Sequence, residues 1–169
     1  MCSSDLQRCY SACQQGLLSE DLWVDCVLAS AIDPDLATSG RHVLTTFVQY
    51  VPYRLRGGAT WDTQREVLGD RVVEIIGRYA PNVPDAVVAR DVLTPLDLER
   101  RFGLTEGNIF HGELSLEQLA FLRPVPAWAK YKTPIENLWM GGSGVHPGGG
   151  LMGGPGYLAA ASMLKERAV

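Results

Sequence analysis

The residues best suited to chemistry are glycines crowded near the end of the chain. Nine of the sixteen residues from Gly141 to Gly156 are glycine, half of the chain's total of 18. Glycine has no Cβ and reaches positive φ easily, so such a stretch lets backbone N–H groups approach a flat or anionic ligand closely. The apolar run from Leu138 to Met140 is typical of a buried strand, and the helix formers from Tyr157 to Arg167 predict a helix. The predicted order is strand, glycine-rich loop, helix.

We expect this loop to contact a cofactor, and three plainer interpretations stand beside that one. The helix after the loop would direct free N–H groups and its positive dipole end at a ligand. A flexible linker has a similar composition, but linkers seldom separate an apolar strand from an apolar helix. A phosphate-binding loop would carry G-x-x-x-x-G-K-[ST], or G-x-G-x-x-G with an acidic residue further on, and the sequence has neither. A turn that only lets strand and helix pack is the third alternative.

The stretch from Thr133 to Gly156, TPIENLWMGGSGVHPGGGLMGGPG, resembles the C-terminal flavin motif of phytoene dehydrogenase-like FAD-dependent oxidoreductases. The similarity is greatest to the branch of that family named after pyridine nucleotide-disulfide oxidoreductase domain-containing protein 2. It extends over nearly everything from about Leu17 onward. Four further motifs carry it in the same order: DPDLA from Asp33, QYVPY from Gln49, TPLDLE from Thr94 and GNIFHGELS from Gly107.

The resemblance implies an α/β fold, α+β in part, that is the C-terminal fragment of a two-domain FAD/NAD(P)-binding flavoprotein. Residues 7–126 would be part of the substrate-binding domain, a mixed sheet with helices, and residues 127–169 the last strand, loop and helix of the FAD-binding domain. The N-terminal dinucleotide-binding part is expected to be absent, because no G-x-G-x-x-G opens the chain. Residues 1–6 match the translated end of a sequencing-library adapter, so we expect them to be non-native.

The same resemblance names the residues that would bind FAD. The backbone from Gly141 to Gly144 would line the ribityl or pyrophosphate portion. The segment from Leu151 to Gly153 would pass the pyrimidine edge of the flavin, where N–H groups stabilise negative charge on the reduced ring. The hydride chemistry itself belongs to the cofactor. The full expected set is Gly141, Gly142, Ser143, Gly144, His146, Pro147, Gly150, Leu151, Met152 and Gly153; no catalytic residue is identified and no metal site is expected.

Histidine, with a pKa near neutrality, is a candidate acid or base at two places. His146 lies in the loop, where it would either move a proton or fix the loop by hydrogen bonding. His111 and Glu113 would form a proton-handling pair or a turn ahead of Ser115. His42 heads a strand, and we expect a structural role for it.

Other side chains have open assignments. Arg123 and Pro124 resemble a family segment near the junction with the flavin domain, and an interdomain salt bridge is the alternative. Five aromatic residues would line a substrate cavity or form core, with core favoured for each one singly: Phe47, Tyr50, Tyr53, Phe110 and Phe121.

The function expected is hydride transfer between a hydrophobic small molecule and FAD, with the isolated fragment inactive and binding FAD weakly or not at all. The alternative is a non-catalytic protein-interaction or regulatory module derived from a flavoprotein, with a protein partner or a second copy of the chain. The compartment would be the cytoplasm if the source is bacterial and the mitochondrial matrix if it is eukaryotic.

Composition limits the other classes. With 46% hydrophobic residues, 20% charged residues and a net charge of −4, the chain is of ordinary globular type. It has no basic patch that predicts nucleic-acid binding, and no apolar run near the ~20 residues of a membrane span. Its four cysteines lie in the first 26 residues without C-x-x-C spacing, which favours reduced thiols over disulfides or zinc.

Periodicity and turn residues predict the remaining elements. A helix over 6–15 is followed by strands over 22–30 and 42–50, which would pair across the turn from Asp33 to Gly40. A capping box, Thr63 to Glu66, would open a helix with an apolar stripe of Leu68, Val72, Ile75, Ile76 and Tyr79. Residues 86–93 are a further strand candidate. Helices would begin at Pro95, ending at Gly103, and at Ser115, ending near Phe121.

Overall fold

The structure is a computed structural model that describes residues 3–112, 115–150 and 152–167. The chain divides into two compact units, Met1–Asp97 and Leu98–Val169, and each is taken by itself. The domain boundary expected at 126/127 concerns the chain's place within a larger enzyme, and it stays a prediction. The mixed α/β character is confirmed, with a sheet of only two strands among the described residues.

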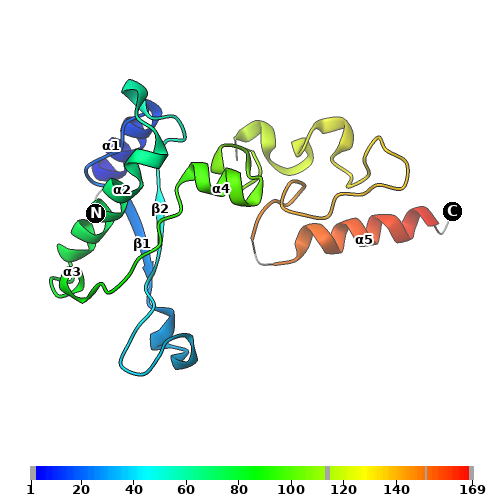
Figure 1. Cartoon of the computed structure of the whole chain (residues 1–169). Helices are drawn as coiled ribbons and strands as arrows, with labels where there is room; N and C mark the ends of the chain where they lie inside the picture. Colours follow the sequence, from blue (N-terminus) through cyan, green and yellow to red (C-terminus); the bar gives the residue numbers. More distant parts are fainter. Residues whose placement is uncertain (1–2, 113–114, 151, 168–169) are drawn as a thin grey trace. The chain divides into compact units, whose positions relative to one another are not determined.

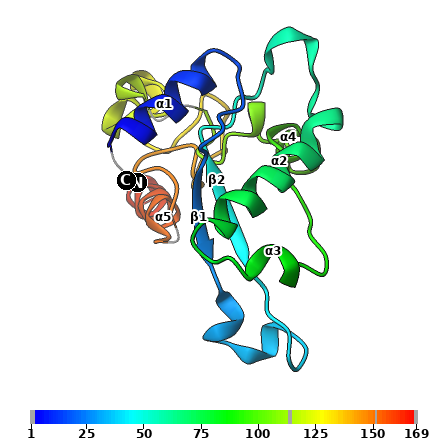
Figure 2. The same ribbon diagram turned by 90° about the vertical axis from the view of Figure 1, so that its left-hand side faces the viewer.

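An antiparallel hairpin forms the sheet of the first unit. Strand β1 (Trp23–Val27) pairs with β2 (Thr45–Gln49), with Trp23 opposite Gln49. Both predicted strands and their pairing are confirmed, although each strand is shorter than expected. Figures 1 and 2 show the tip of the hairpin extending beyond the helices of this unit. The tip contains two short 3-10 turns, at Ala29–Ala31 and Pro34–Leu36.

His42 has the structural role that was expected. Its Nδ1 atom lies 3.2 Å from the hydroxyl oxygen of Ser30, and that same oxygen accepts a hydrogen bond from the Val43 N–H at 3.0 Å. Ser30 is buried. The contact ties the returning strand of the hairpin to the turn that precedes it.

Helices α1 (Ser3–Gln14) and α2 (Trp61–Gly77) complete the core of this unit. The predicted stripe on α2 is confirmed at Leu68, Val72 and Ile75, which are buried. Tyr79 is exposed, because the helix ends at Gly77 and the stripe ends with it. The buried cluster consists of Cys9, Leu22, Trp61, Leu68, Val72 and Ile75.

Helix α2 begins at Trp61, so the predicted start at the Thr63 capping box is wrong. Thr60 is the extended residue before the helix, and the Thr63 hydroxyl donates back to its carbonyl at 2.9 Å. The indole N–H of Trp61 donates to the carbonyls of Pro52 and Tyr53, at 3.1 and 2.9 Å. This buried tryptophan fixes the first turn, since a buried indole N–H needs acceptors at a set position.

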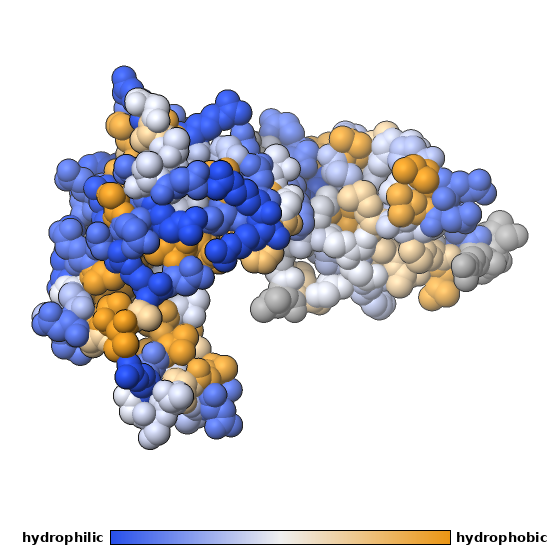
Figure 3. Space-filling view, in the orientation of Figure 1, coloured by the Kyte–Doolittle hydropathy of each residue, from blue (hydrophilic) through white to orange (hydrophobic). Residues whose placement is uncertain are grey.

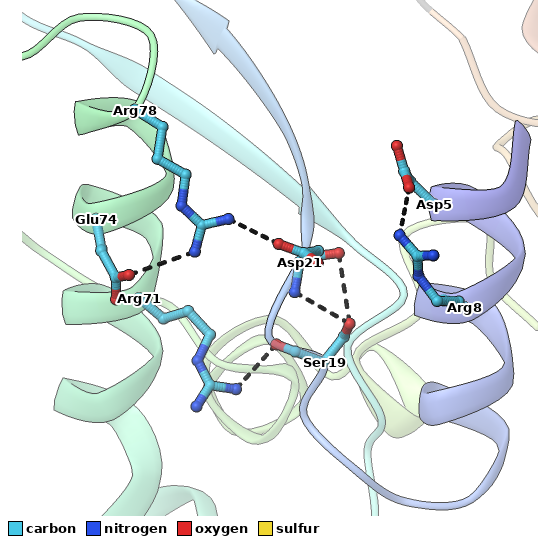
Figure 4. Close-up of polar contacts among 7 residues, drawn as sticks. All are labelled: Asp5, Arg8, Ser19, Asp21, Arg71, Glu74 and Arg78. Carbon is cyan, nitrogen blue, oxygen red and sulfur yellow. Dashed lines mark hydrogen bonds and ion pairs between the residues drawn. The ribbon is translucent and has the colours of Figure 1, made fainter. Parts of the chain in front are cut away.

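Arg71 on α2 and Arg78, the residue directly after it, hold the helix to the segment before β1 (Figure 4). Arg71 donates to the carbonyls of Leu18 and Ser19 at 2.9 and 2.8 Å. Arg78 pairs with Asp21 at 2.7 Å and with Glu74 at 3.3 Å. The side chains of these ion pairs are about half exposed or more, as is typical of structural surface contacts.

The strand expected at residues 86–93 is wrong. A short helix, α3 (Val83–Ala86), leads into a segment without strand pairing, and Val88 is 75% exposed. Arg90 holds this segment to α2 through ion pairs with Glu66 and Asp70, each at 2.7 Å. Of the apolar residues here, Val92 packs against the core beside α2, and Val87, Val88 and Leu93 are exposed.

Helix α4 (Pro95–Phe102) is capped as its sequence predicts. The Thr94 N–H and hydroxyl donate to the Asp97 carboxylate at 2.9 and 2.6 Å, and the Asp97 N–H donates to the Thr94 hydroxyl at 3.2 Å. Gly103, with φ +68°, ends the helix. This reciprocal cap satisfies donors that a helix start leaves without partners.

The second unit is built mostly from turns, followed by α5 (Gly154–Arg167). The helix expected from Ser115 is wrong: Leu116–Gln118 and Ala120–Leu122 are separate 3-10 turns, and Ser115 makes no side-chain cap. The predicted strand before the glycines is also wrong, because only Trp139 forms a bridge, to Lys132. Leu138 is 47% exposed, since within the described part of this unit no neighbouring strand covers it. Helix α5 is confirmed and begins three residues early.

The aromatic residues expected in the core are not buried in this chain. Phe47, Tyr50, Phe110 and Phe121 are exposed, with Phe121 reaching 76%, and Tyr53 is half-buried. The ring of Tyr50 meets that of Tyr10 edge-on, with centroids 5.7 Å apart. Among the described helices, none combines the length and the apolar character that crossing a bilayer requires.

Candidate functional site

The glycine-rich loop runs from Gly141 into α5 (Figure 1) and comes close to that helix at Gly141 and at Pro147. A Cβ placed on Gly141 would lie 3.4 Å from the Ala159 Cβ and the Gly156 Cα. A Cβ on Gly154 would lie 3.1 Å from Pro147. Glycine at these positions lets the loop and the helix approach closely, so the packing interpretation of the loop holds for Gly141.

A buried valine and two turns shape the middle of the loop. Val145 is fully buried, and its N–H donates to the Gly142 carbonyl at 3.2 Å. The Gly148 N–H donates back to the Val145 carbonyl at 2.7 Å. His146 is half-buried between these turns and joins Pro147 through a cis peptide bond. The loop therefore has a defined shape of its own.

Two of the expected cofactor residues present bare backbone to open space. A Cβ on Gly142 or on Gly153 would meet no atom of the described residues within 4 Å, and both residues are exposed. Gly153 also has φ +65°, a conformation that side chains disfavour. These are the places where a ligand would occupy the volume that a side chain would fill.

Arg123 holds the loop in place through hydrogen bonds to the Ser143 carbonyl. The sequence did not reveal this role. Arg123 is 1% exposed, and its guanidinium donates to the Ser143 carbonyl from Nε at 3.2 Å and from Nη2 at 3.0 Å. Nη2 also donates to the carbonyls of Phe110 and His111. The family-based interpretation expects this residue near the junction of residues 7–126 with residues 127–169, and its hydrogen bonds to Ser143 join those two segments. Among the described residues its acceptors are main-chain carbonyls and not carboxylates, so the alternative of a salt bridge finds no support there. An arginine directly before proline in an apolar segment was the one available signal.

The Phe110 and His111 carbonyls that bind Arg123 belong to a tight turn over residues 108–111. Asn108 shapes it: its side chain accepts from the Phe110 N–H at 2.9 Å, and its carbonyl accepts from the His111 N–H at 3.2 Å. A Cβ on Gly149 would lie 3.5 Å from the Phe110 ring, so this turn also supports the loop. The proposed partner of His111, Glu113, lies outside the described residues, as does Leu151 of the expected cofactor set.

Two positively charged groups lie close to the loop. The first is Arg123, whose Nη1 atom is buried and has no hydrogen-bond partner among the described residues. The start of α5 adds the positive end of a helix dipole. Bare glycine backbone beside buried positive charge fits an anionic cofactor such as FAD. In the part of the chain that the structure describes, no three His, Cys, Asp or Glu side chains are grouped as metal ligands.

Comparison with known proteins gives relatives but no family model that matches. The pyridine nucleotide-disulfide oxidoreductase domain-containing protein 2 of Rattus norvegicus is 45% identical over 162 residues, which are 95% of this chain and 28% of that protein. A limonene dehydrogenase component of Castellaniella defragrans is 25% identical over 96% of this chain and 30% of its own length. A lycopene-forming phytoene desaturase of Pseudescherichia vulneris is 32% identical over 76% of this chain and 25% of its own length.

These matches confirm the resemblance that the sequence motifs predicted. The chain spans between about a quarter and a third of the length of the curated relatives it matches. Their names describe oxidoreductases, dehydrogenases and desaturases, which supports oxidoreductase function at that coarse level. The chain is thus similar, over nearly all of its length, to part of pyridine nucleotide-disulfide oxidoreductase domain-containing protein 2 and, more distantly, to part of the phytoene desaturases.

Proposed function

We propose that this chain forms part of an FAD-dependent oxidoreductase of the phytoene dehydrogenase-like type, which transfers hydride between a hydrophobic substrate and the flavin. In this proposal residues 7–126 belong to the substrate-binding domain and residues 127–169 return to the FAD-binding domain. The chain by itself is inactive and binds FAD weakly or not at all.

The observation that carries the proposal is the exposed backbone of Gly142 and Gly153 on a loop of fixed shape. The loop enters α5, whose first N–H groups lack acceptors within the helix. Similarity to the named oxidoreductases supports the same assignment. When bound, FAD supplies the redox chemistry, and the protein contributes binding, orientation and electrostatics.

Each part of the loop then has a task. The backbone at Gly142, Ser143 and Gly144 holds the ribityl or pyrophosphate portion of FAD. Met152 and Gly153, at the entry to α5, lie against the pyrimidine edge, where the helix dipole favours negative charge on the ring. Val145, by its burial, and Arg123, by its hydrogen bonds to the Ser143 carbonyl, keep the loop in place.

Complementation tests the proposal. The chain is titrated with FAD alone, and again with the rest of the Rattus norvegicus relative, produced without the segment that this chain matches. We expect little binding to the chain alone and a stable complex with a bound-flavin absorbance spectrum when both parts are present. If both parts fold and associate but take up no flavin, the proposal fails. A stoichiometric yellow complex of the chain alone refutes the expected weak binding.

A non-catalytic interaction module is the second candidate, favoured by apolar side chains exposed over the hairpin (Figure 3). Ile32 is 87% exposed, and Val27, Leu36 and Phe47 are exposed near it in sequence or on the paired strands. Exposed apolar side chains that lie together often mark a surface that binds another protein. Association of the two parts without any flavin uptake would favour this candidate over the first.

A further inference from the structure

We propose that Arg123 is a positioning residue that makes the glycine-rich loop selective for a phosphate-type anion. Its guanidinium binds the peptide between Ser143 and Gly144 and places beside it a positive charge that no carboxylate of the described residues neutralises. The inference rests on the proposed function, since it concerns the same loop, and it adds the residue that selects the phosphate-type group over the ribityl portion.

The burial of Arg123 makes its charge unusual. Arginine is almost never fully buried unless it is paired, because removing a charge from water is expensive. Here the residue is 1% exposed, and its hydrogen-bond acceptors are the carbonyls of Phe110, His111 and Ser143. Among the described residues no carboxylate pairs with it. The carbonyl dipoles solvate the cation but leave its net charge of one.

The unused donors of the guanidinium point to the same conclusion. Arginine carries five N–H donors, and those on Nε and Nη2 are occupied. Nη1 is buried and has no partner in the part of the chain that the structure describes. A buried donor of this kind is rare in folded proteins and calls for an explanation. An anion held on the other side of the loop offsets the charge without having to touch Nη1.

Arg123 can influence a ligand on the opposite face of the loop through the peptide between Ser143 and Gly144. In a trans peptide the C=O and the next N–H point in opposite directions. Because the Ser143 carbonyl points to Arg123, the Gly144 N–H points away from it. Donation by a cation to that carbonyl polarises the peptide and strengthens its N–H as a donor. Two residues earlier, Gly142 is exposed, and a Cβ there would meet no atom of the described residues within 4 Å, which leaves room for a ligand at this part of the loop.

The test uses the complete 169-residue chain, labelled with ¹⁵N, and inorganic pyrophosphate as the probe at low ionic strength. We expect saturable shifts of the Gly142 and Gly144 amide signals. Arg123→Gln can still donate to a carbonyl but has lost the charge, and we expect it to bind pyrophosphate about tenfold more weakly or worse. Arg123→Lys keeps the charge and should retain most of the affinity. Lys130→Gln, at an exposed lysine of the same unit, is the matched control and should bind like the parent chain.

Three results overturn the proposal. The first is a parent chain whose loop amides do not respond to pyrophosphate. The second is a folded Arg123→Gln variant, judged by the amide signals of α5, that binds as well as the parent. The third is a marked gain of affinity in Glu113→Gln, which would mean that this carboxylate neutralises Arg123. If Arg123→Gln unfolds the unit, a folded Arg123→Lys variant decides the question. Pyrophosphate binding by that variant supports the proposal, and loop amide signals that do not respond to pyrophosphate overturn it.

The titration contains no flavin, so its outcome is separate from that of the complementation experiment. A chain that binds pyrophosphate through Arg123 but takes up no FAD with its complement refutes only the proposed function. If the Arg123→Gln variant and the parent chain take up flavin equally well with the complementing part, only the inference about Arg123 is refuted.

Discussion

Replacing Gly142 by alanine separates ligand contact from packing more cleanly than any other change in the loop. The added methyl group would meet no atom of the described residues within 4 Å, and φ at this position is not positive. We therefore expect the free energy of unfolding to change by no more than about 0.5 kcal/mol, as for other exposed sites. If FAD lies against this backbone, the methyl group overlaps it, at a cost of about 1–3 kcal/mol. Since ~1.4 kcal/mol is tenfold in Kd, FAD should bind roughly five- to 150-fold more weakly.

The neighbouring glycine supplies the matched control. A methyl group on Gly141 would touch α5, at 3.4 Å from the Gly156 Cα, so Gly141→Ala fills the contact between loop and helix and should change FAD affinity less than Gly142→Ala does. Both variants are tested in the complemented complex, by flavin absorbance for affinity and by urea unfolding for stability. Equal FAD affinity in Gly142→Ala and the parent would refute the assignment of this backbone to the cofactor.

Three further predictions concern the first unit. Asp97→Ala should destabilise it by about 3–5 kcal/mol in urea unfolding, because it leaves the Arg65 guanidinium, 2.5 Å away, without its buried partner. Asp21→Ala, at a half-exposed ion pair of 2.7 Å, should lose only about 0–1 kcal/mol, and equal losses would refute the argument from burial. Gly16→Ala should lower the melting temperature more than Gly40→Ala: both have positive φ, at +72° and +74°, but only Gly16 would place a Cβ 2.8 Å from a backbone carbonyl. Burial, with a smaller contribution from Cys9, raises the pKa of the Cys13 thiol. At mildly alkaline pH, iodoacetamide should therefore alkylate Cys13 more slowly in the folded chain than in the chain unfolded by urea, and this difference should shrink as the pH rises. Equal rates in the two states would contradict the prediction.

Local signals in the sequence predicted the elements whose stability is local. The Thr94 cap with Pro95 and Gly103 gave α4, because donors, fixed φ and the terminating glycine all act within one helix. The apolar stripe of α2 predicted which face is buried. Its starting residue was missed because the burial of Trp61, through acceptors at Pro52 and Tyr53, decided it.

Strands were harder to predict, because a strand needs a partner that its own residues do not specify. The strands predicted over 22–30 and 42–50 do pair, across the long connection between Val27 and Thr45, although each is shorter than predicted. Residues 86–93 and Leu138 to Met140 have similar composition, yet the first lies beside α2 and the second forms a single bridge. Arg123 was missed as the loop's anchor for the same reason, since its three acceptors come from two segments distant in sequence.

The most direct measurement is amide hydrogen exchange of the loop in the complemented complex, with and without FAD. The account predicts that FAD slows exchange in the peptide that contains Gly142 and in the one that contains Gly153, while the hairpin of β1 and β2 is unchanged. Unaltered exchange across residues 141–156 in a complex that visibly holds flavin would contradict the central claim, because the cofactor would then be bound without this loop.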